Sequence, residues 1–180
     1  RGLMLASLVQ GPLLRLFLVG VVLLSFQRTL FADLRPADVS IQIMLALAAA
    51  SGAAGGPQKG ALAGFVLGLM YDLSIGTPLG SSSIAMGLGG YVAGYATTIA
   101  VRPPWWLAAI FTTVGAAVGE AVVPVIRTFI GESHPFDPRY ALAVGVVAVA
   151  AGLLSPLFVP VGRWCMRVKE PEWKAPREEL

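Results

Sequence analysis

The amino-acid sequence predicts an all-α integral membrane protein that folds as a bundle of six transmembrane helices. Hydrophobic residues make up 56% of the 180 positions, charged residues only 13%, and the mean hydropathy is +0.76. A soluble domain usually has about 25% charged residues, so this deficit indicates a membrane environment. Six spans of about 20 residues need roughly 120 positions, which leaves room only for short loops.

The expected helices are separated by loops in which Pro, Gly and charged residues gather. The six spans are predicted at residues 13–31, 39–54, 60–73, 83–101, 104–130 and 140–161. We expect one turn at residues 52–60, between the second and third spans, and another at residues 74–83, after the third. Residues 1–165 form the transmembrane domain in this prediction, and residues 166–180 form a polar cytoplasmic tail.

Basic residues predict the orientation, because short cytoplasmic loops carry an excess of Lys and Arg. With the N-terminus inside, nine basic residues fall on the cytoplasmic side: Arg1, Arg15, Lys59, Arg102, Arg163, Arg167, Lys169, Lys174 and Arg177. Four fall on the outer side: Arg28, Arg35, Arg127 and Arg139. We therefore expect a multi-pass protein of the cytoplasmic membrane with both termini inside the cell.

Glycine recurs at every fourth position in the third predicted span. Gly60, Gly64 and Gly68 therefore lie on one face of the expected helix. The next position in this series is Asp72. Small residues matter in lipid because they let helix backbones approach closely where the hydrophobic drive between helices is weak. The same spacing returns in the fourth and fifth spans, at Gly90 and Gly94 and at Gly115 and Gly119.

These glycine faces allow three interpretations. In the first, the glycines pack the helices of this bundle against one another, which is the ordinary role of small residues in membrane proteins. In the second, they form a contact face for another protein or for a second copy of the chain. In the third, helix-breaking residues at corresponding places mark the substrate site of a transporter.

Two acidic residues lie in apolar surroundings. Glu120 is near the middle of the fifth predicted span, where a charge costs a few kcal/mol even on lenient insertion scales. We expect it to face the bundle interior, a cavity or a partner. It is either protonated or hydrogen-bonded to neighbouring hydroxyls, or it has a ligand-binding or coupling role. Asp72 lies at the outer end of a short span, where we expect it to accept hydrogen bonds from the turn at residues 74–80.

Motifs for catalysis or metal binding are absent from the sequence. Cys165 is the only cysteine and His134 the only histidine, so clusters of these ligands cannot form. The hydrolase, zinc-protease and phosphate-loop patterns do not occur. We therefore expect a protein that is not an enzyme, holds no cofactor and, with a net charge of only +3, binds no nucleic acid.

The third span and its flank resemble a signature of the MreD family, the rod shape-determining membrane proteins of bacteria. The family pattern is a glycine-rich third span that ends in Gly-x-x-x-Asp-Leu and is followed by Gly-Thr-Pro-Leu-Gly. Residues 68–73 and 76–80 carry this pattern here, with Asp72, Gly76, Thr77, Pro78 and Gly80 at the matching positions. A second family feature is an Arg-Pro-Asp-like element that opens the second span. Arg35, Pro36 and Asp38 represent it here, with the acid one place later than in the family pattern.

The resemblance implies a non-enzymatic scaffold of the bacterial cell-elongation (rod) complex in the inner membrane, which helps couple peptidoglycan synthesis to cell shape. The main partner would be MreC, in an assembly with RodA and the elongation penicillin-binding protein. The MreB cytoskeleton would lie on the inner side, membrane lipid would surround the spans, and a homodimer is an alternative contact. Arg35, Asp72 and Thr77 would then lie where MreC meets the outer loops.

The same resemblance supplies an alternative function. The MreD family is similar to the S-components of energy-coupling-factor transporters, which are six-helix membrane proteins that hold a small ligand in an outer pocket. The chain would then be an S-component-like, small-molecule-binding subunit of a membrane transporter. Polar groups for such a pocket are few beyond Gln42, Asp72 and Glu120, which favours the scaffold.

Overall fold

The computed structural model describes residues 11–29, 42–131 and 139–166. Helices account for 87% of these residues, and no strand occurs among them. The predicted all-α class is confirmed. Arg35, Pro36, Asp38 and His134 lie outside the described residues.

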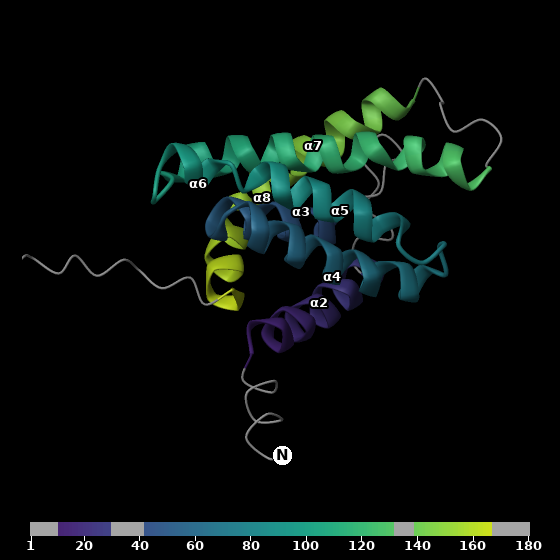
Figure 1. Cartoon of the computed structure of the whole chain (residues 1–180), viewed down its shortest axis with the longest axis horizontal. Coiled ribbons are helices and arrows are strands. Elements are labelled where there is room, and N and C mark those ends of the chain that lie inside the picture. Colours follow the sequence, from purple (N-terminus) through teal and green to yellow (C-terminus); the bar gives the residue numbers. More distant parts are fainter. Residues whose placement is uncertain (1–10, 30–41, 132–138, 167–180) are drawn as a thin grey trace, which may run out of the picture.

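Within these ranges, six helices of at least 13 residues pack together, and a four-residue helix follows the fourth of them. In chain order they are α2 (Pro12–Thr29), α3 (Ile43–Gly55), α4 (Pro57–Ile75), α5 (Ser81–Ala93), α6 (Ala96–Ile99), α7 (Trp105–Ile130) and α8 (Tyr140–Cys165). Figure 1 shows that the turn between α4 and α5 and the end of α7 lie at one end of the molecule, opposite α6.

The junction between α3 and α4 is much shorter than predicted. A turn is expected at residues 52–60, but only Gly56 separates the two helices. Gly56 has a φ of 97°, which glycine adopts without steric cost. Pro57 begins α4, where its missing N–H removes no helical hydrogen bond. The predicted turn is therefore wrong, because one glycine followed by proline is enough to end one helix and start the next.

The fourth predicted span, residues 83–101, is wrong as a single helix. The helix α5 ends at Ala93, and α6 begins three residues later. Between them, Gly94 lies directly against the backbone of Gly56 and Pro57, where no side chain fits. The Thr97 hydroxyl donates a hydrogen bond to the Gly94 carbonyl at 2.9 Å, which helps hold this break.

The short helix α3 forms the centre of the bundle. Twelve of its 13 residues are buried. It packs against α2, α4, α5, α7 and α8, so other helices surround it. Its larger side chains, including Met44, Leu45 and Leu47, form one hydrophobic cluster with Leu67 of α4 and Met86 of α5. Alanines fill the rest of α3 and let its neighbours approach.

Two helices, α7 and α8, are long and apolar enough to cross a membrane. Each has 26 residues. The helices α3 and α5 have 13 residues each, which corresponds to about 20 Å of helix, less than the roughly 30 Å hydrocarbon layer of a bilayer. Prolines lie inside the two long helices, at Pro124, Pro156 and Pro160, which membrane helices tolerate when neighbouring groups satisfy the freed backbone.

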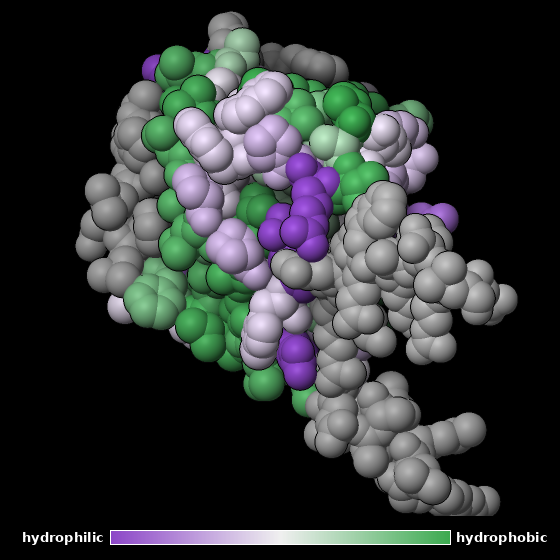
Figure 2. Space-filling model, turned by 90° about the vertical axis from the view of Figure 1, so that its left-hand side faces the viewer, coloured by the Kyte–Doolittle hydropathy of each residue, from purple (hydrophilic) through white to green (hydrophobic). Residues whose placement is uncertain are grey.

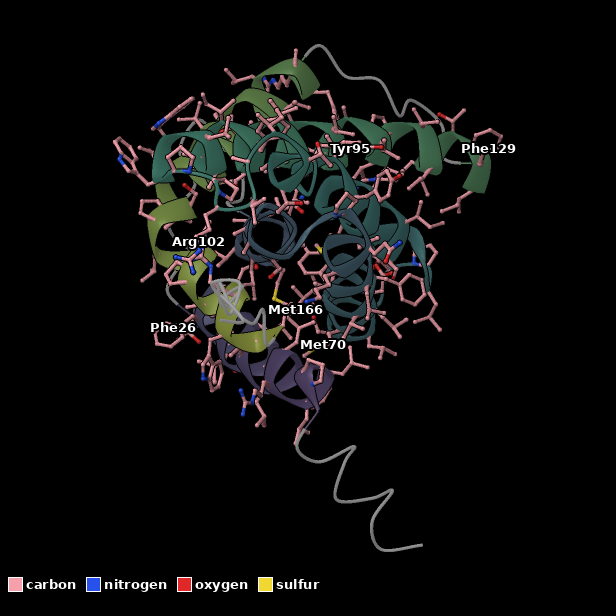
Figure 3. The ribbon with its side chains drawn as sticks, turned by 60° about the vertical axis from the view of Figure 1, so that its left-hand side comes forward. Phe26, Met70, Tyr95, Arg102, Phe129 and Met166 are labelled. Carbon is pink, nitrogen blue, oxygen red and sulfur yellow. The ribbon has the colours of Figure 1, made fainter. Side chains whose placement is uncertain are left out.

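The surface divides into apolar sides and more polar ends. Large hydrophobic side chains are exposed on α2, α4, α5, α7 and α8, among them Phe17, Leu73, Leu88, Phe129 and Leu153. Phe129 projects from the end of α7, as Figure 3 shows, and is 88% exposed. Figure 2 views the end that contains α6, where hydrophilic residues gather in the middle and hydrophobic residues lie toward the sides.

Candidate functional site

The glycine series of α4 lies against α5 within this chain. A methyl group built on Gly60, Gly64 or Gly68 would overlap the α5 backbone, at Gly90, Met86 and Ser83 respectively. The two helices therefore touch backbone to backbone along most of their length. This is the close contact that small residues at helical spacing permit.

The other predicted glycines also lie at contacts between helices of this chain. Gly90 faces Gly60, and Gly94 faces the start of α4 at Pro57. Gly115 lies against Gly89 and Ala93 of α5, and Gly119 lies against Leu45 and Ala85. All three glycine series thus lie in contacts between helices of this chain, so a partner must bind another surface.

Such a surface exists on the exposed face of α4 and α5. A shallow groove of about 480 Å³ runs between the two helices and is almost wholly apolar. Its lining consists of Ala61, Phe65, Ser83, Ile84, Gly87, Leu88 and Tyr91. A methyl group on Gly87 would meet nothing closer than 3.4 Å, so this glycine leaves open space where Gly64 does not. The groove can therefore accept an apolar side chain or a helix ridge from outside.

Asp72 organises the turn between α4 and α5. Its side chain is completely buried. It accepts hydrogen bonds from the Thr77 hydroxyl at 2.8 Å and from the backbone N–H of Gly80 at 2.9 Å, as the sequence predicts. The first turn of α5 adds the Ser82 backbone N–H at 3.2 Å and the Ser81 hydroxyl at 3.4 Å. Asp72 therefore ties the end of one helix to the start of the next.

The glycines of the turn have backbone conformations that suit this arrangement. Gly76 ends α4 with a φ of 76°, and its N–H donates to the Asp72 carbonyl at 2.9 Å. Gly80 precedes α5 with a φ of 99°. Both angles are rare for residues with a side chain, so this turn requires glycine at these two positions.

Glu120 lies on α7 and faces the interior of the bundle. It is only 6% exposed, and its Oε2 accepts a hydrogen bond of 2.7 Å from Nε2 of Gln42, which precedes α3. One of the predicted alternatives gives this carboxylate hydroxyl neighbours, whereas the donor is an amide from a distant part of the chain. Burial of the side chain agrees with the predicted inward orientation.

Glu120 also lines a pocket at the end of the bundle that holds the α4–α5 turn. The pocket has a volume of about 180 Å³. Its polar lining residues are Gln42, Tyr71, Thr77, Ser81, Ser82, Glu120 and Arg127. Its apolar lining residues include Leu45, Ile75, Pro78, Met86, Val123, Ile126 and Ile130. The pocket is thus bounded by α3, α4, α5 and α7, and it brings together the buried carboxylate of Glu120 and the exposed side chain of Arg127.

Sequence reasoning names Gln42 and Glu120 as polar candidates for a pocket but predicts neither their contact nor the place of Arg127. Gln42 and Glu120 are 78 positions apart, so no local pattern links them. The charge pattern places Arg127 only among the basic residues of the outer side, yet it lines the same pocket and interacts electrostatically with Glu120. A signal was available in the spacing, because residues seven apart share one face of a helix.

In the described part of the chain, no three His, Cys, Asp or Glu side chains come together in a way that could hold a metal ion. Comparisons of the chain with protein-family models, with curated proteins and with solved structures found no match.

Proposed function

We propose that this protein is a non-enzymatic scaffold of the inner membrane that binds the single transmembrane helix of MreC in the cell-elongation complex. The resemblance of residues 68–80 to the MreD signature supplies the partner. The structure supports a scaffold by one observation: an open apolar groove remains on α4 and α5 after every glycine series has been used inside the bundle.

The groove has the chemistry that a transmembrane helix needs. The shallow groove is lined by the small residues Ala61, Ser83 and Gly87. Apolar side chains flank it, at Phe65 and Leu88. Ser83 is fully buried, and its hydroxyl has no hydrogen-bond partner among the described residues. Small side chains in the groove let a partner backbone approach closely.

Substitution of Gly87 by leucine tests the groove directly. Gly87→Leu fills the groove from the outside without meeting the α4 backbone closely, so the fold should survive. Gly145→Leu is the matched control, because Gly145 on α8 has no atom near its position. When the chain is co-expressed with MreC, the parent and Gly145→Leu should retain MreC in mild detergent.

We expect Gly87→Leu to weaken MreC binding by about 5- to 150-fold, since overfilling a packed contact costs roughly 1–3 kcal/mol. Crosslinks between the two proteins should fall in the spans or outer loops and not in residues 166–180. If MreC never co-purifies with the parent while a small molecule does, the scaffold is wrong. The alternative, an S-component-like transporter subunit, would then replace it, and the pocket beside Glu120 is the observation that favours it.

We also propose that the chain crosses the membrane six times with both termini in the cytoplasm. The nine-to-four asymmetry of basic residues supports this orientation. The short helix α3 is enclosed by others and has little contact with lipid, and α6 extends the reach of α5. The α4–α5 turn would then lie outside and the α6–α7 connection inside.

Reporter cysteines test this orientation. Cys165 itself is buried and is a poor reporter, so it is replaced by serine. Leu79→Cys lies in the α4–α5 turn and Val101→Cys follows α6, with exposures of 69% and 80% in the parent. A membrane-impermeant thiol reagent should label position 79 in intact cells, and position 101 only after permeabilisation. The opposite pattern would invert the proposed topology.

A further inference from the structure

The pocket between α3 and α7 has room for a small ligand. A cavity needs about 10–15 Å³ of comparable volume to hold one water molecule, and this pocket has about 180 Å³. Its walls come from four helices and from Thr77 and Pro78 of the α4–α5 turn, so several parts of the bundle set its shape.

Hydrogen-bond acceptors are concentrated on one side of this pocket. The buried Glu120 carboxylate accepts one bond from Gln42, which leaves its second oxygen and the Gln42 carbonyl oxygen with capacity to accept. Pro124 follows one turn later and has no N–H, so the backbone carbonyl of Glu120 lacks its usual helical donor. An occupant that supplies several N–H donors and a positive charge would satisfy the second carboxylate oxygen and the Gln42 oxygen.

A positive charge lies on the same wall. Arg127 follows Glu120 by seven positions, which is about 10 Å along the helix axis, and both side chains line the pocket. A simple cation would meet the attraction of Glu120 and also the repulsion of Arg127. A molecule with an ammonium group at one end and an anionic group at the other matches both charges. Glu120 and Arg127 are the charged side chains among the residues that line the pocket, and Ile75, Val123 and Ile126 are apolar neighbours of the two.

We propose that this pocket binds a small zwitterion, with its ammonium group on Glu120 and Gln42 and its anionic group toward Arg127. The ammonium donates to the carboxylate and the amide oxygen, and hydrogen bonds assisted by charge are stronger than neutral ones. The same chemistry can come from a free amino-acid-like or phosphoethanolamine-like molecule or from a phosphatidylethanolamine headgroup. The proposal does not depend on the scaffold function, because MreC capture and zwitterion binding are measured separately.

The first test measures thermal stabilisation of the purified full chain in detergent by three related probes. Phosphoethanolamine carries both charges and three ammonium donors. Choline phosphate has the same charges but no N–H on its nitrogen, and ethanolamine lacks the anion. We expect phosphoethanolamine to bind at least about tenfold more tightly than either relative. This comparison uses the parent protein, so it does not depend on a variant that folds.

Variants then locate the binding. Glu120→Gln and Arg127→Gln should each weaken phosphoethanolamine binding at least about tenfold, because each removes one matched charge. Gln42→Ala provides a second substitution on the ammonium side. Lys59→Gln, which removes an exposed charge at the start of α4, is the control and should bind like the parent. Equal binding of all three probes, or binding that none of the pocket variants weakens, would overturn the proposal.

The source of the zwitterion is distinguished by lipid exchange. Native mass spectrometry is applied to the protein reconstituted in bilayers of phosphatidylethanolamine or of phosphatidylglycerol. Retention of one phosphatidylethanolamine by the parent, lost in Glu120→Gln and displaced by phosphoethanolamine, identifies a lipid headgroup. Binding of phosphoethanolamine without any retained phosphatidylethanolamine identifies a free molecule. The absence of both from the parent would contradict the inference.

Discussion

The contact between α4 and α5 and the pocket between α3 and α7 each bury one carboxylate, but they treat it differently. Asp72, at the end of the first region, is fully buried and accepts bonds from Thr77, Gly80 and the start of α5. Glu120, in the second region, accepts a hydrogen bond from Gln42 and borders open volume.

The difference separates a structural acid from a candidate binding acid. A buried carboxylate with several donors is already stabilised by the fold, and its loss leaves those donors without partners. A buried carboxylate beside a cavity has acceptor capacity that the fold does not use. Acids at similar depth in an apolar bundle can therefore have opposite roles, and substitutions should reveal this.

The largest effect is expected at the α4–α5 contact itself. Gly64→Leu would drive a side chain into the backbone of Met86 and separate two helices that touch. We expect a loss of at least about 3 kcal/mol in unfolding free energy, at the upper end of overpacking effects. Unfolding in detergent, followed by tryptophan fluorescence, measures it. A Gly64→Leu protein as stable as the parent would show that the contact is loose.

The second-largest loss of stability is expected at the turn between α4 and α5. Asp72→Ala removes the acceptor shared by Thr77, Gly80 and the start of α5, so buried donors lose their partner. We expect a loss of about 1–3 kcal/mol in unfolding free energy. Ser74→Ala is the control, because its hydroxyl donates to the nearby Tyr71 carbonyl within the same helix and joins no distant groups. Equal effects of the two substitutions would mean that Asp72 does not organise the turn.

A smaller effect on stability is expected at Glu120. Glu120→Gln keeps the shape of the side chain and an oxygen that can accept from Gln42, so we expect a change below about 1 kcal/mol. Thermal unfolding without added ligand measures this. If Glu120→Gln destabilises the protein as much as Asp72→Ala, the carboxylate is structural and the contrast between the two regions fails.

The smallest effect is expected far from both regions. Gly145 lies on the exposed face of α8, and a methyl group added there would meet no neighbouring atom, unlike one on the glycines of α4. Gly145→Ala should leave stability unchanged or raise it by up to about 1 kcal/mol, because alanine favours a helix over glycine. The same detergent unfolding measurement applies. A clear loss of stability would place Gly145 at a contact, contrary to the observed surface.

Local features of the structure were predictable from the sequence, whereas its long-range contacts were not. Apolar runs placed α2 and α7 to within a few residues, and the Asp72 turn followed from donors that lie within ten positions. The bond from Gln42 to Glu120 joins positions 78 apart and depends on how α3 and α7 pack. The break at Gly94 likewise depends on a close approach between distant backbones, those of Gly94 and Pro57.

The groove on α4 and α5 also could not be predicted from the sequence. Glycine spacing identified the faces that hold the bundle together, because those faces repeat every fourth residue. Ala61 and Gly87 belong to no such series, and only the packing of α4 on α5 shows that they border open space. A pattern in one helix can reveal a contact, but open space between two helices depends on both.

The composition of α3 has a consequence for biogenesis in the proposed membrane setting. Its 13 residues are mostly alanine and glycine, and only four carry large apolar side chains. Leu and Ile favour insertion by a few tenths of a kcal/mol each, so α3 gains little from the lipid on leaving the translocon. Gly56 couples it to α4 without a spacer, which makes the pair a helical hairpin. The hairpin would enter the bilayer as one unit. Within the bilayer, α3 would become stable only after the later helices pack around it.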